Sequence, residues 1–235
     1  MDKYFFIHIP KTAGVKIRAN LHMNANFPHT KLFIPEEGDD LRYVTDTELN
    51  ANNVISGHFG YALRRRLDAD WRALTVLRNP VERIISGYYY WKTLPAAPLS
   101  IAARELPIYD FARSDNQAVL DYVDNAQTWQ LFSDYARPTR KRFADHGAAW
   151  VLEQAKVNLA TLDFVGLQED MSGTLTKLTR KFSWRVTDAP SLRKNETPPY
   201  DLASIDQQRL RDALGDKIVL DEALYACGCD LYERM

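Results

Sequence analysis

Four short runs of apolar residues divide the chain, and they predict buried strands at residues 4–9, 54–57, 73–77 and 162–166. Each run is nearly continuous rather than alternating, which is typical of strands that are covered on both faces in a parallel sheet. Segments with helical periodicity lie between them. This alternation predicts an α/β fold, in which one domain (residues 1–235) holds a central parallel sheet flanked by helices.

The best-defined helix follows the third apolar run. Asn79 is a favourable N-cap residue, Pro80 suits the first helical position, and Glu82 occupies the third. Apolar side chains then recur with helical spacing at Val81, Ile84, Ile85 and Tyr88. Further helices are expected over 14–24, 46–51, 115–135, 146–160, 169–182, 203–214 and 216–227, short strands at 31–34 and 41–44, short helix and loop over 94–114, and a loop at 187–200.

Composition narrows the class of protein. Hydrophobic residues make up 46% of the 235 residues and charged residues 26%, which is ordinary for a folded globular chain. The 30 Lys and Arg residues nearly balance the 31 Asp and Glu residues, giving a net charge of −1. No overall basic field therefore indicates nucleic acid or a membrane surface as the partner.

Cysteine use and the N-terminal segment bear on metals and location. Cys227 and Cys229 are too close for an unstrained disulfide, and no second Cys or His pair with zinc spacing accompanies them, so we expect reduced thiols and no metal. The first apolar run is shorter than the core of a signal peptide, and no run approaches a membrane span of about 18 residues. These features predict a cytoplasmic protein without a membrane span, and they carry no signal for its oligomeric state.

The loop after the first strand has the features of a phosphate site. Residues 8–15 (HIPKTAGV) run from strand to helix through small residues, so successive N–H groups and the helix N-terminus can face one anion. Lys11 adds a full positive charge. The segment lacks the GxxxxGK[ST] pattern of nucleoside triphosphatases. The alternative is an ordinary strand-to-helix turn with a surface lysine.

A second candidate anion site follows the third strand. Arg78 stands at the end of that strand, and Ser86 lies eight residues later on the predicted helix. A guanidinium binds a phosphate through two parallel hydrogen bonds, and a hydroxyl adds a further donor. The alternative for Arg78 is a helix-entry residue paired with Glu82. Ligands collect at the C-terminal edge of parallel sheets, so the two sites together suit a nucleotide with phosphates at both ends of its ribose.

These two segments carry a family resemblance. The motifs HIPKTAG and RNPVERIISGYYY, in this order, resemble the sulfotransferases that act on carbohydrates, and they are most similar to heparan sulfate (uronosyl) 2-O-sulfotransferases. The resemblance runs from about residue 4 to residue 232. Weaker matches lie at Ser56–Phe59, Asn125–Thr128, Phe164–Glu169 and Leu192–Asn195. It implies the donor 3′-phosphoadenosine-5′-phosphosulfate (PAPS), a carbohydrate acceptor and no metal.

The resemblance also implies roles for individual residues. Lys11 would stabilise the leaving group and His58 would be the general base. The P-loop-like first loop would hold the 5′-phosphosulfate, while Arg78 and Ser86 would hold the 3′-phosphate. The residues implied in this first loop are Lys11, Thr12, Ala13, Gly14, Val15 and Lys16. The family usually has Ser or Thr where this chain has Val15, so one hydroxyl donor is missing.

In the late loop, the resemblance assigns Asn195 to the donor and Arg193 to the acceptor. Two other functions compete with a sulfotransferase. A kinase would need a Walker lysine and an acidic magnesium ligand, and neither is evident. A non-catalytic nucleotide- or glycan-binding protein of the same fold would not need both Lys11 and His58.

Several of these and other residues could have a structural role in place of a functional one. His58 can simply close a strand, and His8, within the first strand, is expected to be structural. The aromatic run 88–91 can stack on sugars or pack in the core, and we expect at least two of its four residues in the core. The basic runs 64–66 and 137–142 are expected to form solvated faces rather than to meet an acidic glycan.

Overall fold

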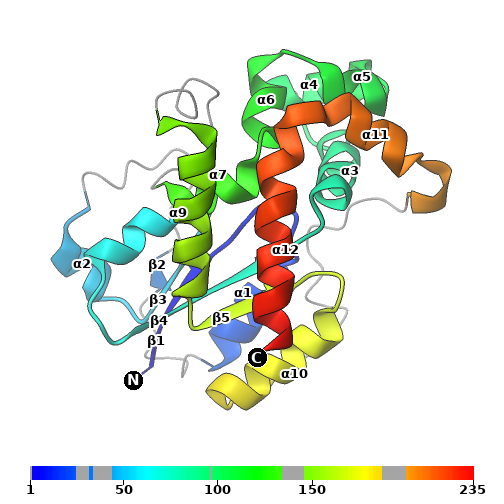
Figure 1. Cartoon of the computed structure of the whole chain (residues 1–235). Coiled ribbons are helices and arrows are strands. Elements are labelled where there is room, and N and C mark those ends of the chain that lie inside the picture. Colours follow the sequence, from blue (N-terminus) through cyan, green and yellow to red (C-terminus); the bar gives the residue numbers. More distant parts are fainter. Residues whose placement is uncertain (1, 25–31, 34–43, 96, 134–145, 187–199) are drawn as a thin grey trace.

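A five-stranded parallel sheet forms the centre of the computed structural model, which describes residues 2–24, 32–33, 44–95, 97–133, 146–186 and 200–235. The strand order is β2-β3-β1-β4-β5, and every pair is parallel (Figure 1). The strands are β1 (Lys3–Ile7), β2 (Leu32–Phe33), β3 (Val54–Gly57), β4 (Trp71–Leu77) and β5 (Phe164–Leu167). The α/β fold with a central parallel sheet is thus confirmed.

The register brings the ends of the three middle strands to one edge. Ile7 of β1 pairs with Gly57 of β3 on one side and with Thr75 of β4 on the other. The Thr75 hydroxyl also donates to the Ile7 carbonyl at 2.9 Å. Because the strands are parallel, the residues that follow them, including His8 and His58, leave the sheet at the same edge.

Side chains of the strands alternate between two helical layers. On β1, Tyr4 and Phe6 face one layer, and Phe5 and Ile7 face the other. The first layer holds α1 (Gly14–Asn24) and α10 (Met171–Phe182). The second holds α2 (Asp46–Asn50), α7 (Ala126–Phe132), α9 (Ala148–Ala160) and α12 (Val219–Glu233). Both faces of the sheet are therefore covered, which explains the continuous apolar runs.

A further group of helices packs around its own apolar core at one end of the sheet (Figure 1). It comprises α3 (Pro80–Trp91), α4 (Pro98–Glu105), α5 (Ile108–Arg113), α6 (Gln117–Val123) and α11 (Gln207–Leu214). In the described ranges, short 3₁₀ helices also lie at Tyr61–Arg66, Leu202–Ser204 and Gly215–Ile218. The assignment of residues 1–235 to one domain stays a prediction.

The caps predicted from the sequence form as expected at α3. The Asn79 side chain accepts hydrogen bonds from the N–H groups of Val81 at 3.1 Å and Glu82 at 3.2 Å. This satisfies two of the donors that a helix N-terminus leaves without partners. None of the helices in the described ranges is long and apolar enough to cross a membrane.

The end of the last helix differs from the prediction. The sequence predicted a helix over 216–227, whereas α12 runs from Val219 to Glu233. A Cβ at Gly228 would lie 2.3 Å from Cδ1 of Leu77 on β4. This glycine therefore lets the helix approach the sheet instead of ending the helix. The predicted strand at 31–34 is confirmed as β2, while 41–43 and 187–199 lie outside the described residues.

Candidate functional site

The loop between β1 and α1 is shaped by an unusual backbone. Lys11 and Ala13 have φ angles of 69° and 64°, in the left-handed region that residues with a Cβ rarely adopt. Thr12, between them, donates its hydroxyl hydrogen to the Ile9 carbonyl at 2.8 Å and is fully buried. This hydrogen bond closes the turn. It also leaves the Thr12 side chain without a hydrogen for a phosphate, so Thr12 can offer only its backbone.

The same turn leaves amide hydrogens directed to the start of α1. The Ala13 carbonyl accepts the N–H groups of Lys16 at 3.0 Å and Ile17 at 3.3 Å, which opens the helix. Within the described ranges, no group accepts a hydrogen bond from the N–H of Thr12, Ala13, Gly14 or Val15. Such donors at a helix N-terminus, where the helix dipole is positive, suit an anion. The missing hydroxyl at Val15 leaves this backbone arrangement intact.

His8 joins this loop to the end of β3. A Cβ at Gly14 would lie 1.8 Å from the His8 ring, so glycine is required where the imidazole crosses the loop. On its other side, the His8 ring lies 4.3 Å from that of His58. Burial, followed by repulsion from His58, Arg18 and Lys11, holds the pKa of His8 well below its usual value. His8 is therefore neutral and packed, as expected of a structural residue.

His58 is exposed at the edge of the sheet, immediately after β3. Its Nδ1 atom lies 2.8 Å from the backbone carbonyl oxygen of His8. A carbonyl can only accept, so the neutral imidazole carries its hydrogen on Nδ1 and has its lone pair on Nε2. This tautomer can take a proton from a substrate hydroxyl at Nε2.

Arg78 links the two predicted anion-binding segments. Its Nη1 atom donates to the Lys11 carbonyl at 3.3 Å, and its Nη2 atom lies 3.6 Å from the Glu82 carboxylate. The ion pair with Glu82, which the sequence left as an alternative, is thus present. The buried Nε–H finds no acceptor in the described part of the chain. A guanidinium with one unused buried donor can still bind an anion.

The Lys11 side chain extends from the first of these segments to the second. Its Nζ atom is 3.9 Å from the centre of the Tyr90 ring on α3, a cation–π contact. Burial, and then the positive charge of Arg78, lower the pKa of Lys11 to about 8. The ammonium is therefore still the main form at neutral pH, in a place where an added anion would stabilise it.

A family model described as a sulfotransferase family matches residues 1–189, and this span contains Lys11, His58 and Arg78. The chain belongs to the sulfotransferase family. It is also similar to the crystal structure of mouse sulfotransferase SULT7A1 complexed with PAP, at 17% identity and a TM-score of 0.41, over 100% of this chain and 89% of that one. No curated protein matches the sequence. The closer similarity to heparan sulfate 2-O-sulfotransferases stays a prediction.

The sulfotransferase holds Arg78 in place through its backbone. The Gln127 side chain on α7 accepts from the Arg78 N–H at 3.1 Å and donates to the Arg78 carbonyl at 2.8 Å. The next N–H, that of Asn79, donates to Glu169 at 2.6 Å, and Tyr225 donates to the other carboxylate oxygen of Glu169 at 3.0 Å. Sequence reasoning missed the role of Gln127, although this residue belongs to the Asn125–Thr128 element.

The other predicted residues of the sulfotransferase have mixed outcomes. Ser86 is buried on α3, two turns beyond Arg78, and Lys16 is half-buried in the first turn of α1. Arg193 and Asn195 lie outside the described residues. In the parts of the chain that are described, no group of three or more His, Cys, Asp or Glu side chains is arranged to hold a metal.

The aromatic run 88–91 serves packing more than exposure. Tyr88 is buried, and Tyr89 and Trp91 pack against the same helical core, which confirms that at least two of the four support the core. The Tyr90 ring instead makes the cation–π contact with Lys11.

The first basic run, residues 64–66, is largely engaged in contacts within the protein. Arg64 donates to the carbonyls of Leu67 and Asp68 at 3.2 Å, and Arg66 pairs with Asp46 at 2.6 Å. Arg65 is exposed. The run is therefore less a solvated face than expected. The second basic run, 137–142, lies outside the described residues.

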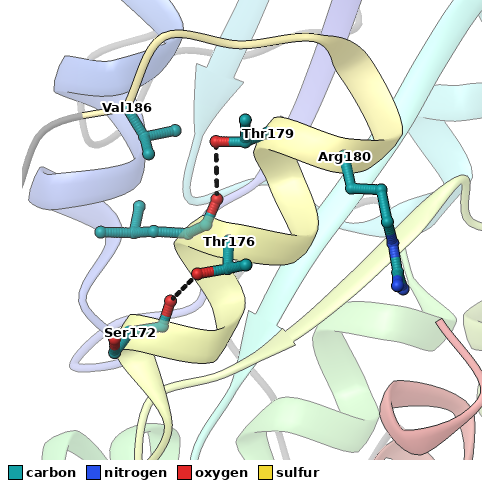
Figure 2. Close-up of a pocket in the computed structure, with 6 residues that line it drawn as sticks. Ser172, Thr176, Thr179, Arg180 and Val186 are labelled. Carbon is teal, nitrogen blue, oxygen red and sulfur yellow. Dashed lines mark hydrogen bonds between the residues drawn. The ribbon is translucent and has the colours of Figure 1, made fainter.

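An open hollow beside α10 is separate from these residues (Figure 2). Its lining consists of Ser172, Leu175, Thr176, Thr179, Arg180 and Val186. Thr176 and Thr179 donate their hydroxyl hydrogens within the helix, to the carbonyls of Ser172 and Leu175. Neither Lys11, His58 nor Arg78 borders the hollow, so we assign it no part in the site.

Proposed function

We propose that this sulfotransferase moves a sulfuryl group from PAPS to a hydroxyl of a carbohydrate, such as a polysaccharide or a glycolipid. The observation that carries the proposal is the contact between the two anion-binding segments, Arg78 Nη1 to the Lys11 carbonyl at 3.3 Å. His8 connects the same loop to His58, through Gly14 on one side and the imidazole contact on the other. A cation, a guanidinium and a candidate base thus share one edge of the sheet.

The chain offers groups of the right chemistry for such a donor. The N–H groups of residues 12–15 and the Lys11 ammonium suit its 5′ side, and the Nε–H of Arg78, which has no acceptor among the described residues, suits its 3′-phosphate. Ser86 and Asn195 are proposed to join the donor contacts, and Arg193 the acceptor contacts. When bound, the donor supplies an electrophilic sulfur and a phosphate leaving group.

The protein's part in the reaction is then to position groups and to stabilise charge. His58 Nε2 takes the acceptor's hydroxyl proton as its oxygen bonds to sulfur. Lys11 stabilises the negative charge on the phosphate oxygen as the sulfur–oxygen bond breaks. An imidazole with its hydrogen on Nδ1 has the lone pair on Nε2 that a general base needs. No metal is required in this scheme, because Lys11 and Arg78 supply the positive charge.

Turnover of labelled PAPS with a panel of glycans tests this function. We expect labelled glycan and one equivalent of 3′-phosphoadenosine-5′-phosphate (PAP). His58→Ala should lose about 10²–10⁴ in turnover, while PAP affinity changes by less than about threefold. His58→Asn should fail as badly, because it keeps polarity without basicity.

The alternatives give different results in the same assay. A binding protein would bind PAP tightly and yield no labelled glycan at all. A kinase would transfer phosphate from ATP and ignore PAPS. Near wild-type turnover in His58→Asn would reject His58 as the base.

A further inference from the structure

Helix α7 places two buried glutamines one turn apart, directly behind the candidate site. Gln127 and Gln130 have 0% and 1% of their surface exposed. Buried amides are costly unless they are hydrogen-bonded, so their partners show what each side chain secures. Those partners are backbone groups at the ends of three different strands.

Gln130 forms hydrogen bonds with two backbone carbonyls next to His58. Its Nε2 atom donates to the carbonyl of His8 at 3.0 Å and to the carbonyl of Phe59 at 2.9 Å. The His8 carbonyl is the same one that accepts the His58 Nδ1 hydrogen at 2.8 Å. Gln130 therefore fixes the acceptor that sets the His58 tautomer, together with the residue that follows His58 in the chain.

Gln127 acts on a different strand end. It forms a pair of hydrogen bonds with the N–H and carbonyl of Arg78, at 3.1 and 2.8 Å. No hydrogen bond in the described part of the chain joins Gln127 to the His58 segment. The two glutamines thus secure two separate functions from one helix.

The helix itself is anchored from behind. The buried Asp221 carboxylate on α12 accepts from the N–H of Gln127 at 3.2 Å, and from the N–H and hydroxyl of Thr128 at 2.7 and 2.8 Å. Asn125, in turn, accepts from the N–H groups of Leu220 and Asp221, at 2.8 and 3.1 Å. These bonds hold the first turn of α7 in place, so a change in the Gln130 side chain need not move the helix.

We propose that Gln130 is a positioning residue for His58, and that it fixes the tautomer and place of the imidazole for proton transfer. Gln127 serves Arg78 and nucleotide binding instead. The part of the proposal that concerns turnover rests on the proposed function. The part that concerns the tautomer does not.

The first experiment compares Gln130→Met with the matched control Gln127→Met, two buried changes of similar shape on one helix. Gln130→Met should lower turnover by about 10- to 100-fold and leave PAP affinity within about threefold. Gln127→Met should weaken PAP by about 5- to 100-fold, because Arg78 loses its support. Thermal unfolding checks that both variants fold, and Gln130→Asn, which keeps a shorter amide, replaces Gln130→Met where it does not.

The pH profile provides a readout that simple destabilisation would not move. In Gln130→Met the His8 carbonyl is no longer held against His58 and stabilises the imidazolium less, so the acid limb of turnover should move to lower pH. The titratable and charged groups that act on His8, just after β1, are His58 itself, Lys11 in the loop and Arg18 on α1. In Gln127→Met these groups are unchanged, and the acid limb should stay in place.

Imidazole ¹⁵N chemical shifts separate this inference from the proposed function. Wild type should show His58 with its hydrogen on Nδ1, and Gln130→Met a mixture of tautomers, whatever reaction the enzyme catalyses. An unchanged tautomer together with equal losses in both glutamine variants would overturn the inference. If His58→Ala keeps its turnover while the tautomer changes as expected, the proposed base is wrong and the positioning role of Gln130 stands.

Discussion

The loop after β1 and the junction between β4 and α3 are both proposed anion sites, but they are built in different ways. The first takes its shape from the backbone, with Lys11 and Ala13 in the left-handed region. The second has an ordinary capped helix start, and its Arg78 is held by side chains from elsewhere in the chain. One site is thus local and strained, while the other depends on tertiary contacts.

This difference predicts how each site responds to change. In the loop, the proposed binding groups are N–H donors that no single side-chain substitution removes, and Lys11 adds the charge. At the junction, the proposed binding depends on one guanidinium that also pairs with Glu82. Substitutions in the loop should therefore mainly affect turnover, and substitutions at the junction should mainly affect nucleotide affinity.

Of the changes in these two segments, Lys11→Ala is expected to have the largest effect. Charge on the leaving oxygen develops mainly in the transition state, so turnover should fall by about 10²–10³ while PAP affinity falls much less. Steady-state kinetics and calorimetric titration of PAP measure the two. Normal turnover with a raised KM would mean that Lys11 only binds the donor.

Arg78→Ala tests the junction between β4 and α3, where the expected effect is on nucleotide affinity. PAP should bind more weakly by about 1.5–3 kcal/mol, roughly 10- to 150-fold, because a charge-assisted contact is lost. Adenosine 5′-phosphosulfate lacks the 3′-phosphate and should bind nearly as before, and calorimetry compares the two ligands. As a control, Glu82→Gln removes the competing carboxylate and should strengthen PAP binding slightly. Equal losses for both ligands would contradict the assignment.

The pH dependence sharpens the role of Lys11. Burial and Arg78 lower its pKa to about 8, so the free enzyme loses this charge as the pH rises through 8. The donor kcat/KM, which reports the free enzyme, should therefore fall above about pH 8, whereas kcat should persist to higher pH because bound phosphates favour the ammonium. In Lys11→Arg the alkaline limb should disappear, since arginine stays charged. A wild-type kcat/KM that is flat to pH 10 would refute this role.

The smallest effect concerns strain in the loop. Ala13→Gly relieves a left-handed φ but adds freedom to the unfolded chain, so the free energy of unfolding should rise by up to about 1 kcal/mol. Denaturant unfolding measures it. Asn79→Ala, at the unstrained junction, should instead lose about 1 kcal/mol with its cap. A stability loss in Ala13→Gly would show that the turn is not strained.

The sequence predicted the parts of the site that follow directly from strand ends. Lys11, His58 and Arg78 each come just after an apolar run, and parallel strands bring such positions to one edge. Gln130 gave no comparable signal. It lies 122 residues from His8 and 71 from Phe59, and only the packing of α7 brings them together. Local patterns do not record such contacts.

Glycines show the same limit in another form. Gly14 was expected in a tight turn, and its place there also admits the His8 ring. Gly228 lies just beyond the helix predicted over 216–227, and the structure places it within α12, where it lets the helix approach β4. A missing side chain has the same sequence signature in both cases. Only the neighbouring atoms distinguish a turn from a close approach.

The anchor of α7 has a consequence for how this enzyme can be recombined. Asp221 lies beyond residue 189, where the family match ends, yet it holds the helix that supports both His58 and Arg78. Burial raises the pKa of its carboxyl, so this anchor is sensitive to its surroundings. In a chimera whose last helix comes from a relative, the first turn of α7 would therefore pack against a different helix. The placement of His58 and Arg78 would then depend on the source of that C-terminal segment as well as on the source of the proposed nucleotide-binding loops.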